Sequence, residues 1–278
     1  MTKLRGRNVP EIDIRNEVYE IRAAYEEERR LVRGMSIMQL FHGSDCRRTL
    51  IAIGVQCLQQ AQGVAFMLLA LGFTNIYDVL IKVLSVNMIF VFLGFYLPDR
   101  FGRRPLLLIG TTLMALSMFT VSMISAFTDN KPTGVLGRLT LAAVIIWIVV
   151  FTLTWGPLPW IICSEVPSNY LREKTLAIAS WSGFGVALIS NLLTPYIQDA
   201  QYGDLQGRIG FVWCGFGVIS FFFCYFLVPE LRNRPLEELD ILFNEGVPAR
   251  KFSTYKVSLN PIEKGTMTPT LAYKEEKA

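Results

Sequence analysis

Long stretches without a charged side chain dominate this sequence of 278 residues. Five of them reach about 20 residues or more, the length that an α-helix needs to cross the hydrocarbon core of a bilayer. They cover residues 49–77, 105–128, 139–164, 175–198 and 209–229. Charged residues make up 18% of the chain, against about 25% in soluble domains. The pattern predicts an all-α membrane protein and excludes disordered, collagen-like, small secreted and soluble classes.

The charge-free stretches and one further apolar segment predict six membrane helices. We expect them at 49–71, 76–97, 105–127, 139–163, 175–198 and 209–229. The second helix carries Asp78 and Lys82 near one end only, where both side chains can reach the interface. The chain is thus expected to have three parts: short cytoplasmic amphipathic helices over 1–48, a six-helix bundle over 49–229 and a cytoplasmic tail over 230–278.

Positive charge between the helices predicts which side each loop faces. One set of loops and flanks carries most of the basic residues, namely Arg47, Arg48, Arg100, Arg103, Arg104, Arg172, Lys174, Arg232 and Arg234. The opposite loops carry only Lys131, Arg138 and Arg208. Because basic residues are retained on the cytoplasmic side, and because six is an even number, both termini are predicted to be cytoplasmic.

Amide side chains interrupt the apolar segments. Gln59 and Gln60 lie in the first, together with Gln56, which shares a helix face with Gln60. An amide both donates and accepts hydrogen bonds, which suits a neutral polyhydroxyl ligand. The alternative interpretation is that these amides bond neighbouring helices to one another. Both interpretations remain open for Asn87 in the second segment.

The fourth segment contains two prolines, Pro157 and Pro159, between Trp155 and Trp160. Proline removes a helical hydrogen bond, so we expect a break here, which membranes tolerate where the backbone lines a cavity. A flexed helix would present an aromatic face to a ligand. The alternative is that both tryptophans belong to the interfacial aromatic belt.

A compact charged motif occupies residues 99–104, between the second and third segments. Its aspartate can cap the next helix and its glycine allows a tight turn. Its arginines can pair with carboxylates at the ends of other helices and so fasten the helices together. The predicted network comprises Asp99, Arg100, Gly102, Arg103, Arg104, Glu165, Arg172 and Glu230. The alternative is positive-inside charge with no switching role.

Enzyme signatures are missing from the sequence. It contains no GxxxxGK[ST] loop, no HExxH and no GxSxG, so we expect no enzymatic activity and no cofactor. The single histidine, His42, cannot build a multi-histidine metal site, and the five cysteines have no paired spacing. No basic, aromatic-interleaved surface suggests nucleic-acid binding.

These motifs resemble the C-terminal half of a sugar porter of the major facilitator superfamily. The family's Gln-Gln-x-x-Gly is matched at 59–63, its Asp-Arg-x-Gly-Arg-Arg at 99–104 and its Gly-Pro-x-Pro-Trp at 156–160. Its Ser-Glu with a following proline is matched at 164–167, and its Pro-Glu-x-x-x-Arg-x-x-Glu-Glu-x-Asp at 229–240. Residues 242–252 resemble the tail of fungal maltose and α-glucoside permeases, which are proton symporters.

The resemblance implies alternating-access sugar transport across a multi-pass membrane, with the plasma membrane as the family's default location. It implies an α-glucoside such as maltose as the substrate, with a hexose as the alternative. It also allows a proton that is transported together with the sugar. Sugar contacts would come from Gln59, Gln60, Asn87 and Trp160. The charged network around 99–104 would form the cytoplasmic gate.

Departures from the family pattern leave other readings open. Ala65 stands where many members have Asn, Gln62 where many have Ser or Thr, and the outer half of the first helix looks shortened. Members have twelve helices, so an N-terminal six-helix half is the expected missing partner. The alternatives are an inactive truncated fragment, a transporter-like sugar sensor, which would usually have a longer tail, and a dimer that imitates a complete transporter.

Overall fold

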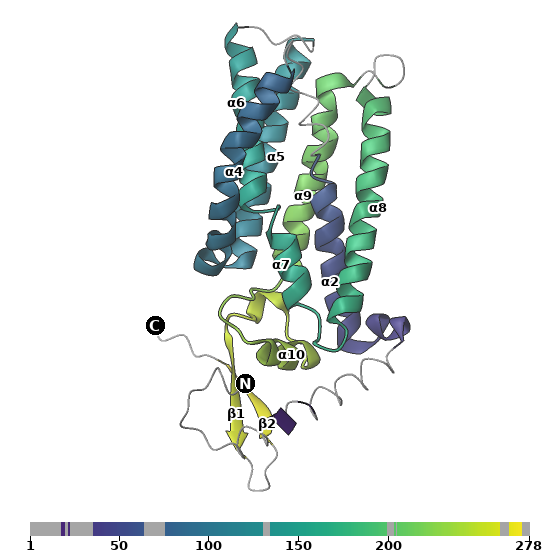
Figure 1. Ribbon diagram of the computed structural model, residues 1–278, viewed down its shortest axis with the longest axis vertical. Helices are drawn as coiled ribbons and strands as arrows, with labels where there is room; N and C mark the ends of the chain where they lie inside the picture. Colours follow the sequence, from purple (N-terminus) through teal and green to yellow (C-terminus); the bar gives the residue numbers. More distant parts are fainter. Residues whose placement is uncertain are drawn as a thin grey trace.

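Six helical segments run side by side in the computed structural model (Figure 1). The structure describes residues 18–19, 22, 36–63, 76–129, 134–198, 203, 205–261 and 267–273. The segments are α2 (Gly43–Gln60), α4 (Ile76–Phe101), α5 (Arg103–Phe127), α6 (Gly134–Leu153) with α7 (Leu158–Glu165), α8 (Arg172–Gln198) and α9 (Gly210–Phe226). Each overlaps one of the six stretches predicted from sequence.

Four helices in the described part of the chain are long and apolar enough to span a membrane. They are Arg103–Phe127, Gly134–Glu165, Arg172–Ile197 and Gly207–Phe226, with mean hydropathies between 1.6 and 2.3. The chain is therefore an all-α membrane protein, as predicted.

Helix boundaries differ most from the prediction at α2. This helix begins at Gly43, six residues before the predicted start at 49, and Asp45 lies in its first turn, where a carboxylate complements the helix dipole. It is preceded by the 3₁₀ helix η1 (Ile37–Phe41), whose first turn Ser36 caps. The outer part of the predicted helix, 64–71, and most of the amphipathic segment 1–48 lie outside the described residues.

The predicted break in the fourth segment is present. Turns at 154–157 separate α6 from α7. The amide of Gly156 donates to the carbonyl of Phe151 over 2.7 Å, five residues back, in place of a regular helical bond. Pro157 supplies no amide hydrogen, and Pro159 lies in the first turn of α7, where none is needed.

Small residues let the helices approach closely. The helix pairs with the most extensive packing are α5 with α9, α2 with α8 and α5 with α6. A Cβ added at Gly110 of α5 would overlap the side chain of Thr154, and one added at Gly94 of α4 would lie 2.8 Å from the Thr152 carbonyl oxygen. These contacts hold the broken fourth segment between α4 and α5.

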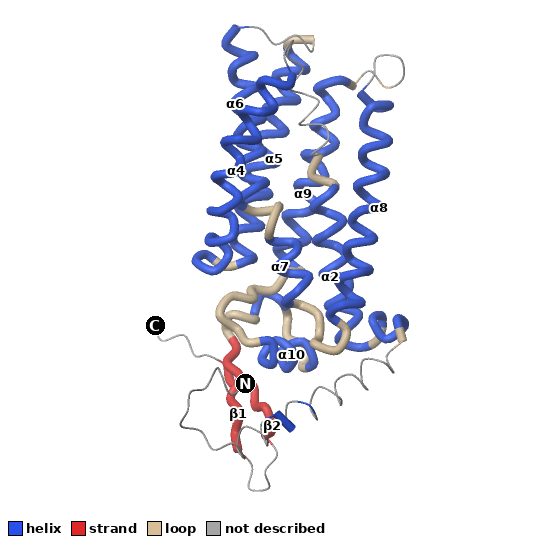
Figure 2. The backbone as a smooth tube through the Cα atoms, viewed as in Figure 1, coloured by secondary structure: helices blue, strands red, loops and turns tan. Residues whose placement is uncertain are grey.

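The segment after α9 folds back onto the end of the bundle. It contains α10 (Leu236–Asn244) and the 3₁₀ helix η3 (Ala249–Lys251), and α10 lies across the helix ends (Figure 2). Its apolar side chains belong to the same core as those of α2, α5 and α9; they are Leu239, Leu242, Phe243, Val247 and Phe252. We call this side of the molecule the α10 end.

Two strands extend beyond the α10 end, and these were not predicted. β1 (Tyr255–Pro261) pairs antiparallel with β2 (Met267–Tyr273), with Val257 opposite Leu271 and Leu259 opposite Pro269. The alternation of polar and apolar residues over 256–260 has the period of a strand. A search for membrane-length apolar runs passes over such a short signal.

Candidate functional site

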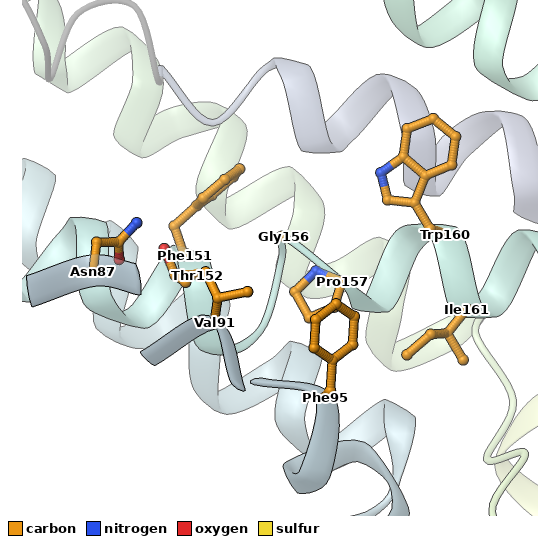
Figure 3. Close-up of a pocket in the computed structure, with 9 residues that line it drawn as sticks. All are labelled: Asn87, Val91, Phe95, Phe151, Thr152, Gly156, Pro157, Trp160 and Ile161. Atoms are coloured by element: carbon orange, nitrogen blue, oxygen red, sulfur yellow. The ribbon is translucent and has the colours of Figure 1, made fainter. Parts of the chain in front are cut away.

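A pocket of about 440 Å³ lies between α4 and the broken α6–α7 segment. Its lining residues are Asn87, Val91, Phe95, Phe151, Thr152, Gly156, Pro157, Trp160 and Ile161 (Figure 3). Sequence reasoning singled out Asn87 and Trp160 but missed Val91 and Phe95. Val91 and Phe95 follow Asn87 at intervals of four residues, so all three lie on one helix face. This spacing could have identified Val91 and Phe95 from the sequence.

Asn87 and Trp160 lie at opposite ends of this pocket (Figure 3). The side-chain oxygen of Asn87 is buried and accepts no hydrogen bond from any described residue. A buried polar atom without a partner is costly, so a donor from a bound molecule would relieve that cost. Trp160 is 41% exposed, and its indole lies 6.5 Å from the ring of Phe184 on α8.

Gln59 contacts the helix break rather than the pocket. Its side-chain nitrogen donates to the carbonyls of Trp155 at 2.7 Å and Gly156 at 3.0 Å, which the break leaves without helical partners. Its side-chain oxygen is buried and unpartnered among the described residues. Gln60, at the end of α2, is half-buried. Neither glutamine is among the residues that line the pocket.

The two tryptophans that flank the helix break, Trp155 and Trp160, have different environments. Trp155 is fully buried, and its indole nitrogen donates to the hydroxyl of Thr111 on α5 over 2.8 Å. Burial rules out a place in an interfacial belt for this residue. Gln62, next to the site, is also buried and donates to the Ser220 hydroxyl on α9 at 3.0 Å.

The charged network lies at the α10 end, with Arg103 at its centre. The guanidinium of Arg103 donates to both carboxylate oxygens of Glu165, at 2.8 and 3.2 Å, in the two-pronged geometry that arginine favours. It also lies 3.1 Å from Asp99 and donates to the Pro98 carbonyl at 3.0 Å. Arg103 therefore joins the ends of α4 and α5 to the end of α7.

Glu230 binds backbone amides rather than a guanidinium. Its carboxylate accepts from the amides of Arg103 and Arg104, at 3.0 and 3.2 Å, and from those of Leu231 and Arg232, both at 3.0 Å. Gly102 makes this possible. It has a φ of +95°, and an added Cβ would lie 2.7 Å from a Glu230 carboxylate oxygen.

The other arginines of the predicted network have separate contacts. Arg104 donates to the Tyr225 carbonyl at 2.7 Å, and Arg100 lies over the ring of Phe101 at 6.0 Å. Arg172 donates to the Asn169 side chain at 2.7 Å and does not pair with Glu165. Seven residues separate Arg172 from Glu165, but the turns at 169–171 direct the two side chains to different partners.

A second ion pair at the α10 end was missed by sequence reasoning. Arg48, only 2% exposed, donates to the Asp240 carboxylate and lies 4.6 Å over the Phe243 ring. Its neighbour Arg47 donates to the Val247 carbonyl at 2.7 Å, and burial lowers the pKa of this guanidinium. These residues were counted only as positive flanks, and no local pattern connects them with partners almost 200 positions away.

The fold and these motifs are those of the sugar-porter family of membrane proteins. Residues 1–243 match the family model described as "Sugar (and other) transporter", and the chain belongs to this family. It is 31% identical over 258 residues to the high glucose sensor of Saccharomyces cerevisiae, covering 87% of this chain and 33% of that protein. It is 29% identical over 269 residues to a major facilitator-type transporter of Aspergillus rugulosus, covering 90% of this chain and 49% of that one.

Solved structures give the same result. A double-tryptophan mutant of XylE superposes with a TM-score of 0.65 at 26% identity, covering 81% of this chain and 48% of that one. The proton:xylose symporter XylE bound to 6-bromo-6-deoxy-D-glucose gives a TM-score of 0.61 at 27% identity, covering 70% and 42%. The chain thus spans about half, or less, of the length of the relatives it matches.

Proposed function

We propose that this chain is the C-terminal half of a sugar transporter that works by alternating access. The observation that carries the proposal is the pocket between α4 and the broken fourth segment. One end holds an amide oxygen with no partner among the described residues, and the other holds a half-exposed indole. In the complete protein the site lies between two six-helix halves, which rock against each other.

The sugar would be held by amide hydrogen bonds and by stacking on an indole. Asn87 offers an acceptor that no residue in the described part of the chain occupies, and Trp160 offers an aromatic face. The Gln59 oxygen is likewise unoccupied there, although the Gln59 nitrogen donates to the helix break. With Gln60 these are the four proposed sugar-contacting residues.

The network at the α10 end would act as the gate. Arg103 with Glu165, and Glu230 with the loop around Gly102, connect the ends of α4, α5, α7 and α9. Separating those ends requires breaking charge-assisted hydrogen bonds, so the network would favour the state that is closed on this side. With the termini cytoplasmic, that state is open to the outside of the cell. Asp99, Arg100, Arg104 and Arg172 would contribute charge around it.

The finer assignments are an α-glucoside such as maltose as substrate, proton symport in the complete protein and a plasma-membrane location. They are supported by the tail motif at 242–252 and by the sugar-porter family. Hexose is the alternative substrate. Glucose sensing is the second candidate function, because a high glucose sensor is among the most similar relatives.

Uptake of radiolabelled maltose and glucose in transporter-null yeast tests the proposal. The chain would be expressed alone and fused behind the six N-terminal helices of a related transporter. We expect uptake by the fusion, with maltose preferred, and none by the chain alone. The fusion carrying Asn87→Ala should have a raised KM, because a sugar hydrogen bond is lost.

Membrane insertion is checked by epitope tag in every strain. No uptake by an inserted fusion would overturn the transport proposal and favour a sensor or an inactive fragment. Uptake by the chain alone would show that the missing half is dispensable. In the fusion, Glu165→Gln should shift the distribution of conformational states more than sugar affinity. Loss of affinity without such a shift would exclude the gate.

A further inference from the structure

An apolar groove of about 430 Å³ lies between α5 and α9, apart from the candidate sugar pocket. Its floor contains two small residues, Ala115 and Gly217, and an added Cβ at Gly217 would lie 3.1 Å from the Cβ of Ala115. Larger side chains form its walls, among them Leu116, Phe119 and Val218, which are 57%, 46% and 48% exposed. Because α5 and α9 span the membrane, these exposed walls face lipid.

Stacked aromatic rings continue from this groove to the α10 end. Phe221 and Phe222 line the groove. One turn further along α9, Tyr225 stacks on Phe221 with ring centres 6.3 Å apart, and Phe226 stacks on Phe222 at 6.3 Å. Tyr225 and Phe226 are also exposed, at 39% and 55%. A molecule lying in the groove would therefore reach the end of α9 along an aromatic surface.

Arg250 covers that surface where α9 leaves the membrane. Its guanidinium lies 4.1 Å from the Tyr225 ring and 4.4 Å from the Phe226 ring. It is exposed and forms no ion pair with any acid in the described part of the chain. Arg104 adds a second positive charge on the same ring, at 5.5 Å. The nearby carboxylate of Glu230 already accepts hydrogen bonds from four backbone amides.

From this arrangement we infer a binding site for an anionic phospholipid in the leaflet at the α10 end. One acyl chain occupies the α5–α9 groove, and the negative headgroup pairs with Arg250. From Cys214 to Phe222 the helix axis rises by eight steps of 1.5 Å, about 12 Å, so the groove accommodates a substantial part of an acyl chain. The headgroup charge supplies selectivity, because apolar contacts alone treat all lipids of equal chain length alike.

Native mass spectrometry of the purified chain tests this site. The chain in detergent is titrated with equal amounts of palmitoyl-oleoyl phosphatidylserine and palmitoyl-oleoyl phosphatidylcholine, and the retained lipids are counted. We expect the serine lipid to be retained in excess. Arg250→Gln should lower the serine-to-choline ratio about fivefold, the factor expected for one basic residue at an anionic surface. Arg250→Lys keeps the charge and should keep the preference.

Matched variants separate the two parts of the site. Lys251→Gln removes one charge from the adjacent exposed residue and should leave the ratio unchanged. Val218→Trp fills the groove and should lower retention of both lipids, whereas Val212→Trp, at a position of similar exposure on α9 outside the groove, should not. Soluble glycerophosphoserine should fail to displace the bound lipid.

Several outcomes would overturn the inference. Equal retention of the two lipids would do so, as would equal effects of the substitutions at Arg250 and Lys251. Loss of the preference in Arg250→Lys would assign Arg250 a structural role instead. Equal effects of the two tryptophan variants, or displacement by glycerophosphoserine, would exclude an acyl chain in the groove.

Discussion

Gln59 is the residue whose role changes most between sequence and structure. The motif presents it as a sugar ligand, yet its nitrogen holds the two carbonyls exposed by the helix break. Mutation can distinguish the two roles, because the neighbouring Gln60 has the same side chain but does not bond the carbonyls of the helix break. The two glutamines therefore form a matched pair.

We predict that Gln59→Leu lowers the free energy of unfolding of the chain by about 2 kcal/mol, because one buried and one half-buried carbonyl lose their donor. Gln60→Leu should cost little. The comparison is made by unfolding the purified chain in detergent with sodium dodecyl sulfate and following helix content. Equal stability of the two variants would show that the bonds at the break contribute nothing.

Gly102 is constrained both by its backbone and by its neighbour. Its φ of +95° is unfavourable for any residue with a Cβ, and that atom would also meet the Glu230 carboxylate. Gly102→Ala should therefore destabilise the chain by about 3 kcal/mol, combining backbone strain with loss of packing.

Gly246→Ala is the control for this prediction. Gly246 has a φ of +69° but nothing within 4 Å of an added Cβ, so only the backbone strain of about 1 kcal/mol applies. Unfolding midpoints in the same detergent give the difference. If both variants lose the same amount, the contact with Glu230 is not constraining.

At the scale of elements, an ion pair joins α10 to α2, and its arginine is buried while its aspartate is one-third exposed. Arg48 has almost no exposed surface, so removing Asp240 leaves its charge in the core with Asp45, at 4.0 Å, as the remaining acid. Asp240→Leu should cost about 3 kcal/mol and release α10 from the bundle. Limited proteolysis should then cleave within residues 244–252 faster than in the unsubstituted chain.

The double variant Arg48→Met with Asp240→Leu tests the cause. An apolar pair of similar volume removes the stranded charge, and such replacements are often neutral or stabilising. Protection of 244–252 should therefore return. Cleavage in the double variant equal to that in Asp240→Leu would mean that the charge pair itself, rather than an unpaired arginine, governs docking.

At the scale of the whole molecule, the even number of helices predicts that both ends lie on one side of the membrane. An N-glycosylation acceptor inserted after Asp129 should be glycosylated in yeast, because this loop is predicted to face the lumen during synthesis. An acceptor inserted after Asn233 should not be modified, because the α10 end is predicted to be cytoplasmic. Glycosylation at the second site, or at neither, would contradict the predicted orientation.

The surface of the molecule also bears on the proposed N-terminal six-helix half. Along α8, large apolar side chains are widely exposed, including Trp181 at 80%, Phe184 at 60% and Leu188 at 61%. Trp160, which lines the candidate pocket, lies next to Phe184. We propose that a second six-helix half covers this surface in the complete protein.

The sequence by itself determined the class of fold, because charge-free runs of membrane length admit few alternatives. It also determined the helix break, since Pro157 cannot donate a backbone hydrogen bond, and the loop at Gly102, since the motif is local. Which carboxylate each arginine pairs with was decided only by the tertiary structure. Arg103 meets Glu165, Arg172 does not, and Arg48 meets Asp240. These choices depend on how the helices pack against one another and on how the turn at 169–171 directs Arg172, and spacing along the chain determines neither.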